Sequence, residues 1–110
     1  MNQFDLYLAD LNPTIGREQR GTRPVLIISN DYENLLDIIT IIPLTSRKEG
    51  RKIYPNEVLL TEELPLPSIL LCQQIRTISK KRLIKKLTTI KTLDTRQKIL
   101  DTLCLRFKPV

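Results

Sequence analysis

Residues 5–29 read DLYLADLNPTIGREQRGTRPVLIIS, and this stretch decides the fold. Residues 5–10 alternate apolar and polar side chains, which is typical of a strand, and residues 24–29 form a second, largely apolar strand. Between them, residues 11–23 contain Asn12-Pro13 and two glycines, which favour turns. Such a connection is longer than a structural hairpin needs, so we expect a functional loop.

Working outward, further strands are predicted downstream at residues 37–43, 56–60 and 83–90, and residues 68–72 and 74–78 form one or two more. The first of them is rich in β-branched residues and apolar on both faces, so it should be buried on both sides. Residues 79–82 are expected to form a short capped turn. Short strands with tight turns predict a mostly β protein, a small antiparallel barrel.

The end of the chain predicts a C-terminal α-helix that packs on this barrel. Asp94 or Thr95 is the expected cap, and Pro109 should end the helix. The apolar face is expected to contain Leu93, Ile99, Leu100, Leu103, Cys104 and Phe107.

Length and composition predict a single domain over residues 1–110, because 110 residues with 41% hydrophobic content suit one core. Cys72 and Cys104 lie in apolar stretches and are interpreted as buried thiols of a reducing compartment. Asp5 and Asp10 interrupt the first ten residues, and no apolar run approaches the length of a membrane span. We therefore expect a cytoplasmic protein without a leader or membrane association.

The chain contains no histidine. This excludes histidine-based acid/base chemistry, Ser/His/Asp triads and ordinary Cys/His zinc sites. No calcium-loop pattern of carboxylates is present either, and we expect neither a metal nor a cofactor. Residues 1–46 carry three basic and six acidic side chains, whereas residues 47–110 carry fifteen and six. The basic half favours an anionic partner, nucleic acid first, although solvated lysines would give the same count.

Glu18 and Arg23 lie in one glycine-containing loop, and Arg23 directly precedes Pro24. The proline restricts Arg23 to an extended backbone, so its guanidinium projects from the start of a strand. A guanidinium placed in this way suits a phosphate, which it can bind through two parallel hydrogen bonds. The alternative is a surface ion pair between Arg23 and Glu18.

The loop motif Gly16-x-Glu18-Gln19-x-Gly21-x-Arg23-Pro24-Val25 resembles that of the MazF/PemK family of toxins. Three further segments resemble the same family in the expected order: DLNPT at residues 10–14, IPLTS at residues 42–46, and QIRTI at residues 74–78 followed by Lys81-Arg82-Leu83. The resemblance implies an SH3-like barrel of the MazF/CcdB type with a C-terminal helix, and a homodimer.

For activity, the resemblance implies the toxin of a type II toxin–antitoxin system, held in check by a cognate antitoxin with an acidic C-terminal segment. Such toxins are metal-independent endoribonucleases that cut single-stranded RNA at short sequences. The ribose 2′-hydroxyl attacks the adjacent phosphate and leaves a 2′,3′-cyclic phosphate and a 5′-hydroxyl end. Since the substrate supplies the nucleophile, the absence of histidine is compatible with this reaction.

The family's catalytic arginine matches Arg23 and its threonine matches Thr45. Both can stabilise the charge that develops on the phosphate, although the Thr45 hydroxyl also suits the start of a turn. Glu18 matches the loop glutamate, and it either accepts the proton of the 2′-hydroxyl or orients Arg23.

The sequence departs from the family pattern at several positions. One branch has a histidine where this chain has Arg17, and an Arg-x-Asp pair where it has Leu71 and Gln73. The acid/base set of that branch is therefore missing. The family's usual glycine before Asp5 is Phe4 in this chain, which concerns the entry into the strand and not the chemistry.

A second loop, polar and basic, is predicted at residues 45–52 around Gly50. RNA binding is expected to involve side chains of this loop, of the loop at residues 11–23, and Gln74. The cations could equally be solvated, Gln74 could read a base edge or complete a strand-end network, and the run from Lys80 to Lys86 is interpreted as a solvated edge. With few aromatic residues, a broad stacking platform is not expected. The candidate RNA-binding residues are Arg17, Gln19, Arg20, Arg47, Lys48, Arg51, Lys52 and Gln74.

Two other functions remain open on the sequence. One is a non-catalytic toxin of the same fold that binds and poisons DNA gyrase, and the other is an RNA-binding barrel without catalysis. The presence of Glu18, Arg23 and Thr45 in register with the family motif favours the nuclease.

Overall fold

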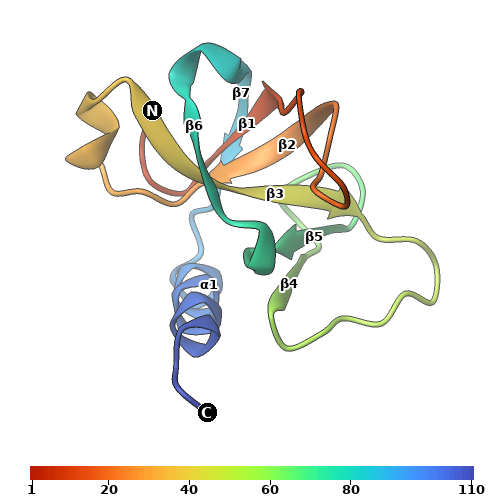
Figure 1. Cartoon of the computed structure of the whole chain (residues 1–110). Helices are drawn as coiled ribbons and strands as arrows, with labels where there is room; N and C mark the ends of the chain where they lie inside the picture. The colour runs from red at the N-terminus through yellow and green to blue at the C-terminus, as the bar shows by residue number, and fades with distance from the viewer.

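The computed structural model describes residues 1–110 and confirms a mostly β chain with a C-terminal helix (Figure 1). No helix is long and apolar enough to cross a membrane. The strands are β1 (Asp5–Asp10), β2 (Thr22–Ile27), β3 (Ile38–Ser46), β4 (Glu57–Leu60), β5 (Ser68–Leu71), β6 (Arg76–Ser79) and β7 (Leu83–Thr89). The helix is α1 (Leu93–Arg106), and three short 3₁₀ turns are η1 (Glu33–Leu35), η2 (Cys72–Gln74) and η3 (Lys80–Arg82).

The seven strands form one antiparallel sheet in the order β4-β5-β3-β2-β1-β7, and β6 also pairs with β3. The terminal strands β4 and β7 do not pair with each other, so the barrel remains open. Figure 1 shows α1 beside the strongly coiled sheet, where it contacts β4 and η2.

Strand β3 pairs with two different strands along one edge. Its first half pairs with β6, ending at Ile41 opposite Arg76, and its second half pairs with β5, starting at Leu44 opposite Leu70. On β3 only residues 42 and 43 separate the two pairings. On the segment that runs from β5 to β6, residues 71–75 separate them. Residue 43 is a proline and has no N–H to donate to a neighbouring strand. The surplus partner residues therefore loop out as η2, beside a hollow in the surface.

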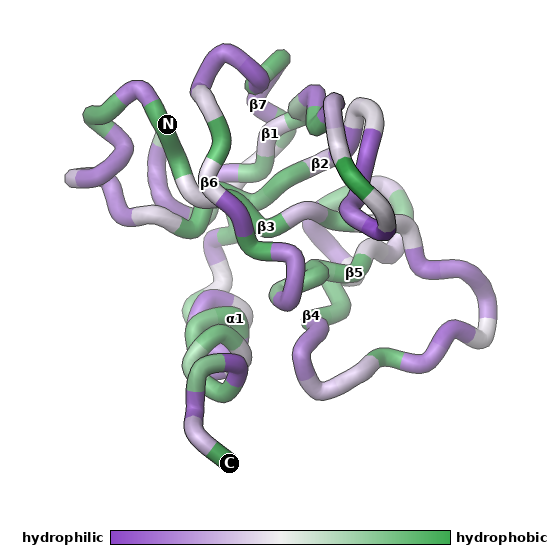
Figure 2. Tube along the Cα trace, viewed as in Figure 1, coloured by the Kyte–Doolittle hydropathy of each residue, from purple (hydrophilic) through white to green (hydrophobic).

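Both faces of β3 are buried from Ile41 to Leu44, as the sequence predicts, whereas Asp37 and Ile38 at the start of the predicted strand are exposed. Leu26, Ile28 and Ile42 belong to the larger core, between the sheet and Ile99 of α1. Val25 and Ile41 belong to a smaller core on the other face. Figure 2 shows the resulting hydrophobic colouring along β2, β3 and β5, and the hydrophilic colouring of the loop after β3.

Several sequence predictions need correction. Cys104 is exposed and only Cys72 is buried, because residue 104 lies on the solvent side of α1. Burial raises the pKa of the Cys72 thiol to about 11. Thr92 occupies the N-cap position in place of Asp94 or Thr95, and its side chain makes no capping hydrogen bond. The helix begins at Leu93, which is exposed like Phe107.

Phe4 has a left-handed backbone with a φ of 72°, a conformation that is unfavourable for residues other than glycine. Two hydrogen bonds hold it there: its N–H donates to the Ile27 carbonyl (2.7 Å), and its carbonyl accepts from the Ile90 N–H (3.0 Å). Its ring is buried in the larger core, and the Arg96 guanidinium carbon lies 4.8 Å from the ring centroid. Burial of the ring therefore compensates for the unfavourable backbone.

Candidate functional site

The functional loop was predicted over residues 11–23, and in the structure it spans residues 11–21 (the β1–β2 loop) because β2 begins at Thr22. Hydrogen bonds close its base. The Leu11 N–H donates to the Gly21 carbonyl (3.0 Å), and the Gly21 N–H donates to Asn12 Oδ1 (3.1 Å). Gly21 has a φ of 77°, which a residue with a Cβ adopts only with strain. Arg82 of η3 donates to the carbonyls of Asp10 and Asn12. The base of the loop is thus fixed on the sheet.

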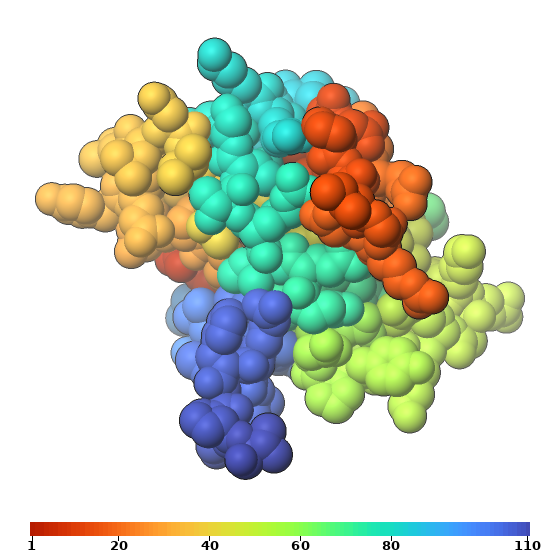
Figure 3. All heavy atoms as spheres, viewed as in Figure 1, coloured from red at the N-terminus to blue at the C-terminus, as the bar shows by residue number.

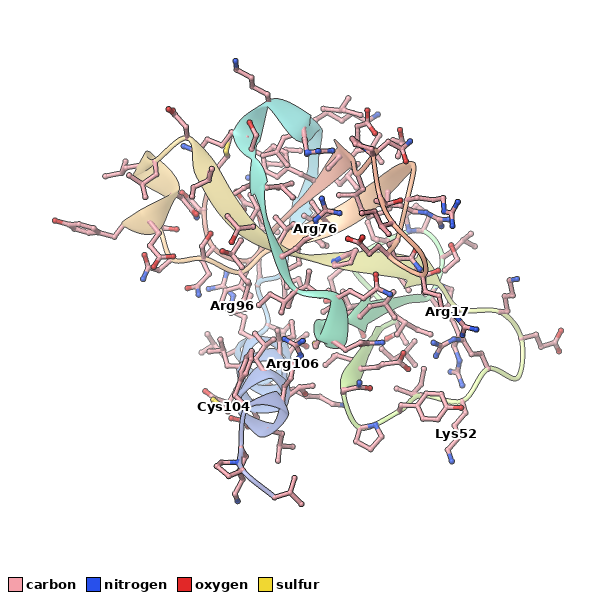
Figure 4. The ribbon with its side chains drawn as sticks, viewed as in Figure 1. Arg17, Lys52, Arg76, Arg96, Cys104 and Arg106 are labelled. Atoms are coloured by element: carbon pink, nitrogen blue, oxygen red, sulfur yellow. The ribbon has the colours of Figure 1, made fainter.

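The tip of the same loop is attached to the segment between β5 and β6. The Gln19 N–H donates to Gln74 Oε1 (2.8 Å) and Gln74 Nε2 donates to the Arg17 carbonyl (3.5 Å). Glu18 Oε1 accepts from the Ile15 N–H (2.9 Å), and Glu18 Oε2 lies 3.8 Å from Nη1 of Arg76. Figure 4 shows Arg76 on β6 beside this loop, and Arg17 at the end of the loop nearer to Lys52.

Two neighbouring hollows lie along this contact. The first has a volume of about 230 Å³ and is lined by Leu11, Glu18, Gln19, Pro43, Gln73, Gln74, Ile75 and Arg76. The second has a volume of about 330 Å³ and is lined by Gln19, Thr45, Ser46, Lys48, Arg51, Leu71, Gln73 and Gln74. Three glutamines line both of them, so they form one groove between the β1–β2 loop and the loop after β3. Figure 3 shows the β1–β2 loop standing beside the residues that connect β5 to β6.

Three polar side-chain atoms in this region are buried without a hydrogen-bond partner: Gln19 Oε1, Gln73 Oε1 and Arg76 Nη1. All three residues line the first hollow. Buried polar atoms are almost always paired in folded proteins. A group of unpaired donors and acceptors around one hollow is therefore the arrangement expected of a polar ligand site.

Arg23 and Thr45 occupy corresponding positions on adjacent strands. Val25 of β2 pairs with Pro43 of β3, and one further step of two residues along each strand leads to Arg23 and Thr45. Thr45 lies inside β3, opposite Ile69 of β5, and not in a loop as the sequence predicted. Arg23 is half-buried and its Nε donates to the Arg20 carbonyl (3.1 Å). Its Nη atoms are thus not used by that hydrogen bond.

An ion pair between the buried Glu57 and the partly exposed Arg51 holds residues 47–56, the β3–β4 loop. Arg51 donates from Nη1 and Nη2 to the two carboxylate oxygens of Glu57, each at 2.9 Å, and the Glu57 side chain is only 2% exposed. The hydrogen bonds from Arg51 outweigh the effect of burial and lower the pKa of Glu57 below its ordinary value of 4.5. Arg47 in turn donates to the Arg51 carbonyl from Nε (3.1 Å) and Nη2 (3.0 Å). The loop is therefore ordered beside the second hollow.

The structure brings together only part of the predicted site. Glu18, Gln19, Thr45, Lys48, Arg51 and Gln74 line the two hollows. Arg51, however, is already engaged by Glu57. The remaining predicted residues line neither hollow: Arg17, Arg20, Arg23, Arg47 and Lys52.

Sequence reasoning missed Glu57, Gln73 and Arg76. Glu57 stood at the start of a predicted strand, where a charged residue has no reason to be buried. Gln73 fell between two predicted strands, and Arg76 lay within the second of them. The available signal was the pair Gln73-Gln74, two polar residues between apolar runs at the break between β5 and β6.

Comparison with known proteins places these features in a family. Residues 2–107 match the family described as PemK-like, MazF-like toxin of type II toxin–antitoxin system. A crystal structure of MazF from Deinococcus radiodurans is 26% identical, with a TM-score of 0.80 over 96% of this chain and 94% of that one. An endoribonuclease in complex with its cognate antitoxin, from a mycobacterial species, is 25% identical, with a TM-score of 0.79 over 100% and 99% of the two chains.

A MazE–MazF complex from Deinococcus radiodurans shares the fold at 22% identity, with a TM-score of 0.73 over 99% of this chain and 97% of that one. The family match covers the β1–β2 loop, β3 and the segment between β5 and β6, which together build the groove. The chain therefore belongs to the family of PemK-like, MazF-like toxins of type II toxin–antitoxin systems.

Proposed function

We propose that the protein is an endoribonuclease toxin that cuts single-stranded RNA in the groove between the β1–β2 and β3–β4 loops. The observation that carries the proposal is the placement of Arg23 and Thr45 on the adjacent strands β2 and β3, with Thr45 lining a groove of amides and cations. The family membership and the likeness to a mycobacterial endoribonuclease support it.

In the proposed reaction the ribose 2′-oxygen forms a bond to phosphorus, and the bond from phosphorus to the 5′-oxygen breaks. Arg23 and the Thr45 hydroxyl stabilise the negative charge that builds up on the phosphate oxygens. Glu18 accepts the proton of the 2′-hydroxyl, and water returns a proton to the leaving 5′-oxygen. The contacts of Glu18 with Ile15 and Arg76, and not with Arg23, favour this role over that of orienting Arg23.

The proposal includes the partners expected from the family. The active species is a homodimer in the cytoplasm, and a cognate antitoxin with an acidic C-terminal segment neutralises it. The cationic side chains around the groove, Arg17, Arg20, Lys48 and Lys52, are exposed and suit both RNA phosphates and acidic residues.

The deciding experiment is incubation of the purified protein with a long RNA in EDTA, followed by mapping of the cut ends. We expect cleavage without added metal, with 5′-hydroxyl and 2′,3′-cyclic phosphate ends. Strict dependence on magnesium, or 5′-phosphate ends, would contradict the mechanism. A gyrase supercoiling assay on the same preparation tests the alternative, since inhibition of gyrase without RNA cleavage would favour a non-catalytic toxin.

A further inference from the structure

Glu57 is the most enclosed carboxylate next to the groove, and its surroundings define which atoms it can hold. It is the first residue of β4 and is paired with Leu71 of β5. Its oxygens accept from Nη1 and Nη2 of Arg51 and from the Tyr54 N–H (3.0 Å). Because an ionised carboxylate only accepts hydrogen bonds, every neighbour must turn a donor toward it.

Gln73 is such a neighbour. It follows Leu71 by two residues, in η2, which contacts β4. Its side-chain amide lies near enough to the Glu57 carboxylate to add to the lowering of the Glu57 pKa, an effect that only the donor end of an amide can have. An amide has one donor end and one acceptor end, so the Nε2 group must face Glu57. The oxygen is thereby turned away from the carboxylate.

That oxygen is one of the three buried atoms without a partner, and Gln73 lines both hollows. In the first hollow it is accompanied by Gln19 Oε1, a second acceptor without a partner, and by Arg76 Nη1, which has the Glu18 carboxylate 3.8 Å away but no hydrogen-bond partner. Leu11, Pro43 and Ile75 supply apolar walls. A flat group with an apolar face and a polar edge matches such a hollow, and an unstacked RNA base is a group of this kind.

We propose that Glu57 is a positioning residue that determines base specificity: it holds the Gln73 amide so that Oε1 accepts a hydrogen bond from the exocyclic amino group of one RNA base. The proposal rests on the proposed function, because it requires that RNA binds in the groove. A base with an amino group is accepted at this position, whereas uracil presents carbonyl oxygens at the edges where cytosine carries its amino group. The buried acceptor then stays unpaired, and the wrong base is rejected.

The test begins with the sites at which the wild-type protein cuts a long RNA. Short RNAs are then made in which each amino-bearing base near the cut is replaced in turn by its analogue without the amino group. Cytosine becomes uracil, adenine becomes purine, and guanine becomes hypoxanthine. At one position we expect kcat/KM of the wild type to fall by about tenfold to a hundredfold.

Glu57→Gln should abolish this difference in kcat/KM between the two RNAs. The amide at position 57 can donate to Gln73 Oε1, so the Gln73 amide can rotate by half a turn and exchange its donor and acceptor ends. The ratio of the two rates is insensitive to partial unfolding, which lowers both rates equally. Gln73→Met, which removes the acceptor and leaves Glu57 paired with Arg51, should also lose the discrimination. Glu49→Gln is the matched control, since Glu49 is an exposed carboxylate in the same loop.

Full discrimination in Glu57→Gln or in Gln73→Met overturns the inference. The same holds if no position of the RNA depends on an amino group although the wild type cuts RNA, and in that case the proposed function survives. If the wild type cuts no RNA, both the proposed function and this inference are wrong.

Discussion

Glu18 Oε2 lies 3.8 Å from Nη1 of Arg76, so a charged pair joins the β1–β2 loop to strand β6 at the edge of the first hollow. The two side chains are 48% and 26% exposed. An ion pair so exposed contributes under about 1 kcal/mol to stability. Its effect is to hold the loop tip over the groove and not to hold the fold together.

Replacing Arg76 should therefore affect RNA binding more than stability. We expect Arg76→Met to raise KM for RNA several-fold while the midpoint of urea unfolding changes little. Steady-state cleavage kinetics and urea unfolding measure the two effects. Lys85→Met, which removes an exposed cation from β7, is the control. A large fall in the unfolding midpoint of Arg76→Met alone would show that the pair is structural.

Arg23→Ala should remove most of the cleavage activity. Loss of one donor to the developing charge lowers the rate on the order of 10²–10³-fold. Arg23→Lys should restore only part of the rate, because an ammonium cannot form two parallel hydrogen bonds to a phosphate. Single-turnover cleavage rates give the measurement, and Arg20→Ala is the neighbouring control. Equal losses in both variants would mean that charge alone, and not the position of Arg23, matters.

The ion pair between Arg51 and Glu57 should make stability depend on pH. Hydrogen bonds from Arg51 lower the pKa of Glu57 in the folded protein, so the pair contributes fully above the unfolded value of 4.5. Its contribution is lost as the pH falls below that value and through the folded pKa. We expect the difference in unfolding free energy between wild type and Glu57→Gln to be constant near neutral pH and to shrink in acid. Urea unfolding over a pH series provides the measurement.

The same pH series also tests a second carboxylate, Asp5. Burial, the largest single influence, raises the pKa of Asp5, but hydrogen bonds from Thr89 (2.7 Å) and the Asn2 N–H (2.9 Å), helped by Lys86, outweigh it and the pKa is lowered. Glu57→Gln should therefore still lose stability in acid through Asp5. A difference between wild type and Glu57→Gln that grows in acid would contradict the expected sign.

At position 4 a glycine variant is expected to be more stable than an alanine variant. Both Phe4→Ala and Phe4→Gly lose the buried ring, at a cost of about 3–5 kcal/mol. Only the alanine variant keeps the strain of the positive φ, so Phe4→Gly should be about 1 kcal/mol more stable than Phe4→Ala. Thermal or urea unfolding measures this order. The reverse order would show that the backbone relaxes at position 4.

Antitoxin and RNA should compete for the groove. An acidic segment and RNA phosphates seek the same exposed cations, so charge reversal at Lys48 and Lys52 should weaken both. The measurement is the RNA affinity of the Arg23→Ala protein, titrated with a peptide of the cognate antitoxin. A ternary complex with unchanged RNA affinity would place the inhibitory contact elsewhere.

The positions of the strands and of the helix along the chain follow from local patterns in the sequence. Residues 5–10 alternate in polarity and form β1 with the predicted bounds, and the two apolar faces of β3 correspond to two cores. Gly21 and the residues around Asn12 predict the β1–β2 loop from turn chemistry alone. These features depend on neighbours in sequence, so composition and spacing are sufficient.

The groove depends on pairings that no local pattern contains. The first hollow exists because residues 71–75 of one segment face residues 42 and 43 of β3, a mismatch that arises only when β5 and β6 both pair with β3. Glu57 looked like a surface residue because its partner, Arg51, comes from a loop that folds back over it. Thr45 was predicted to begin a loop, but pairing with β5 extends the strand past it.

Under the proposed function, the double pairing of β3 determines when during synthesis the chain can first cleave RNA. A ribosome adds about 5–20 residues per second, and the N-terminal part of a chain emerges first. A nascent chain that ends before β5 already contains Glu18, Arg23 and Thr45 but lacks Gln74 and Arg76, the residues that anchor the β1–β2 loop. It also lacks both partners for the far edge of β3. Truncated proteins made from damaged mRNA are therefore expected to be inactive. An antitoxin can be synthesised during the whole time before β5 and β6 pair with β3 and the groove forms.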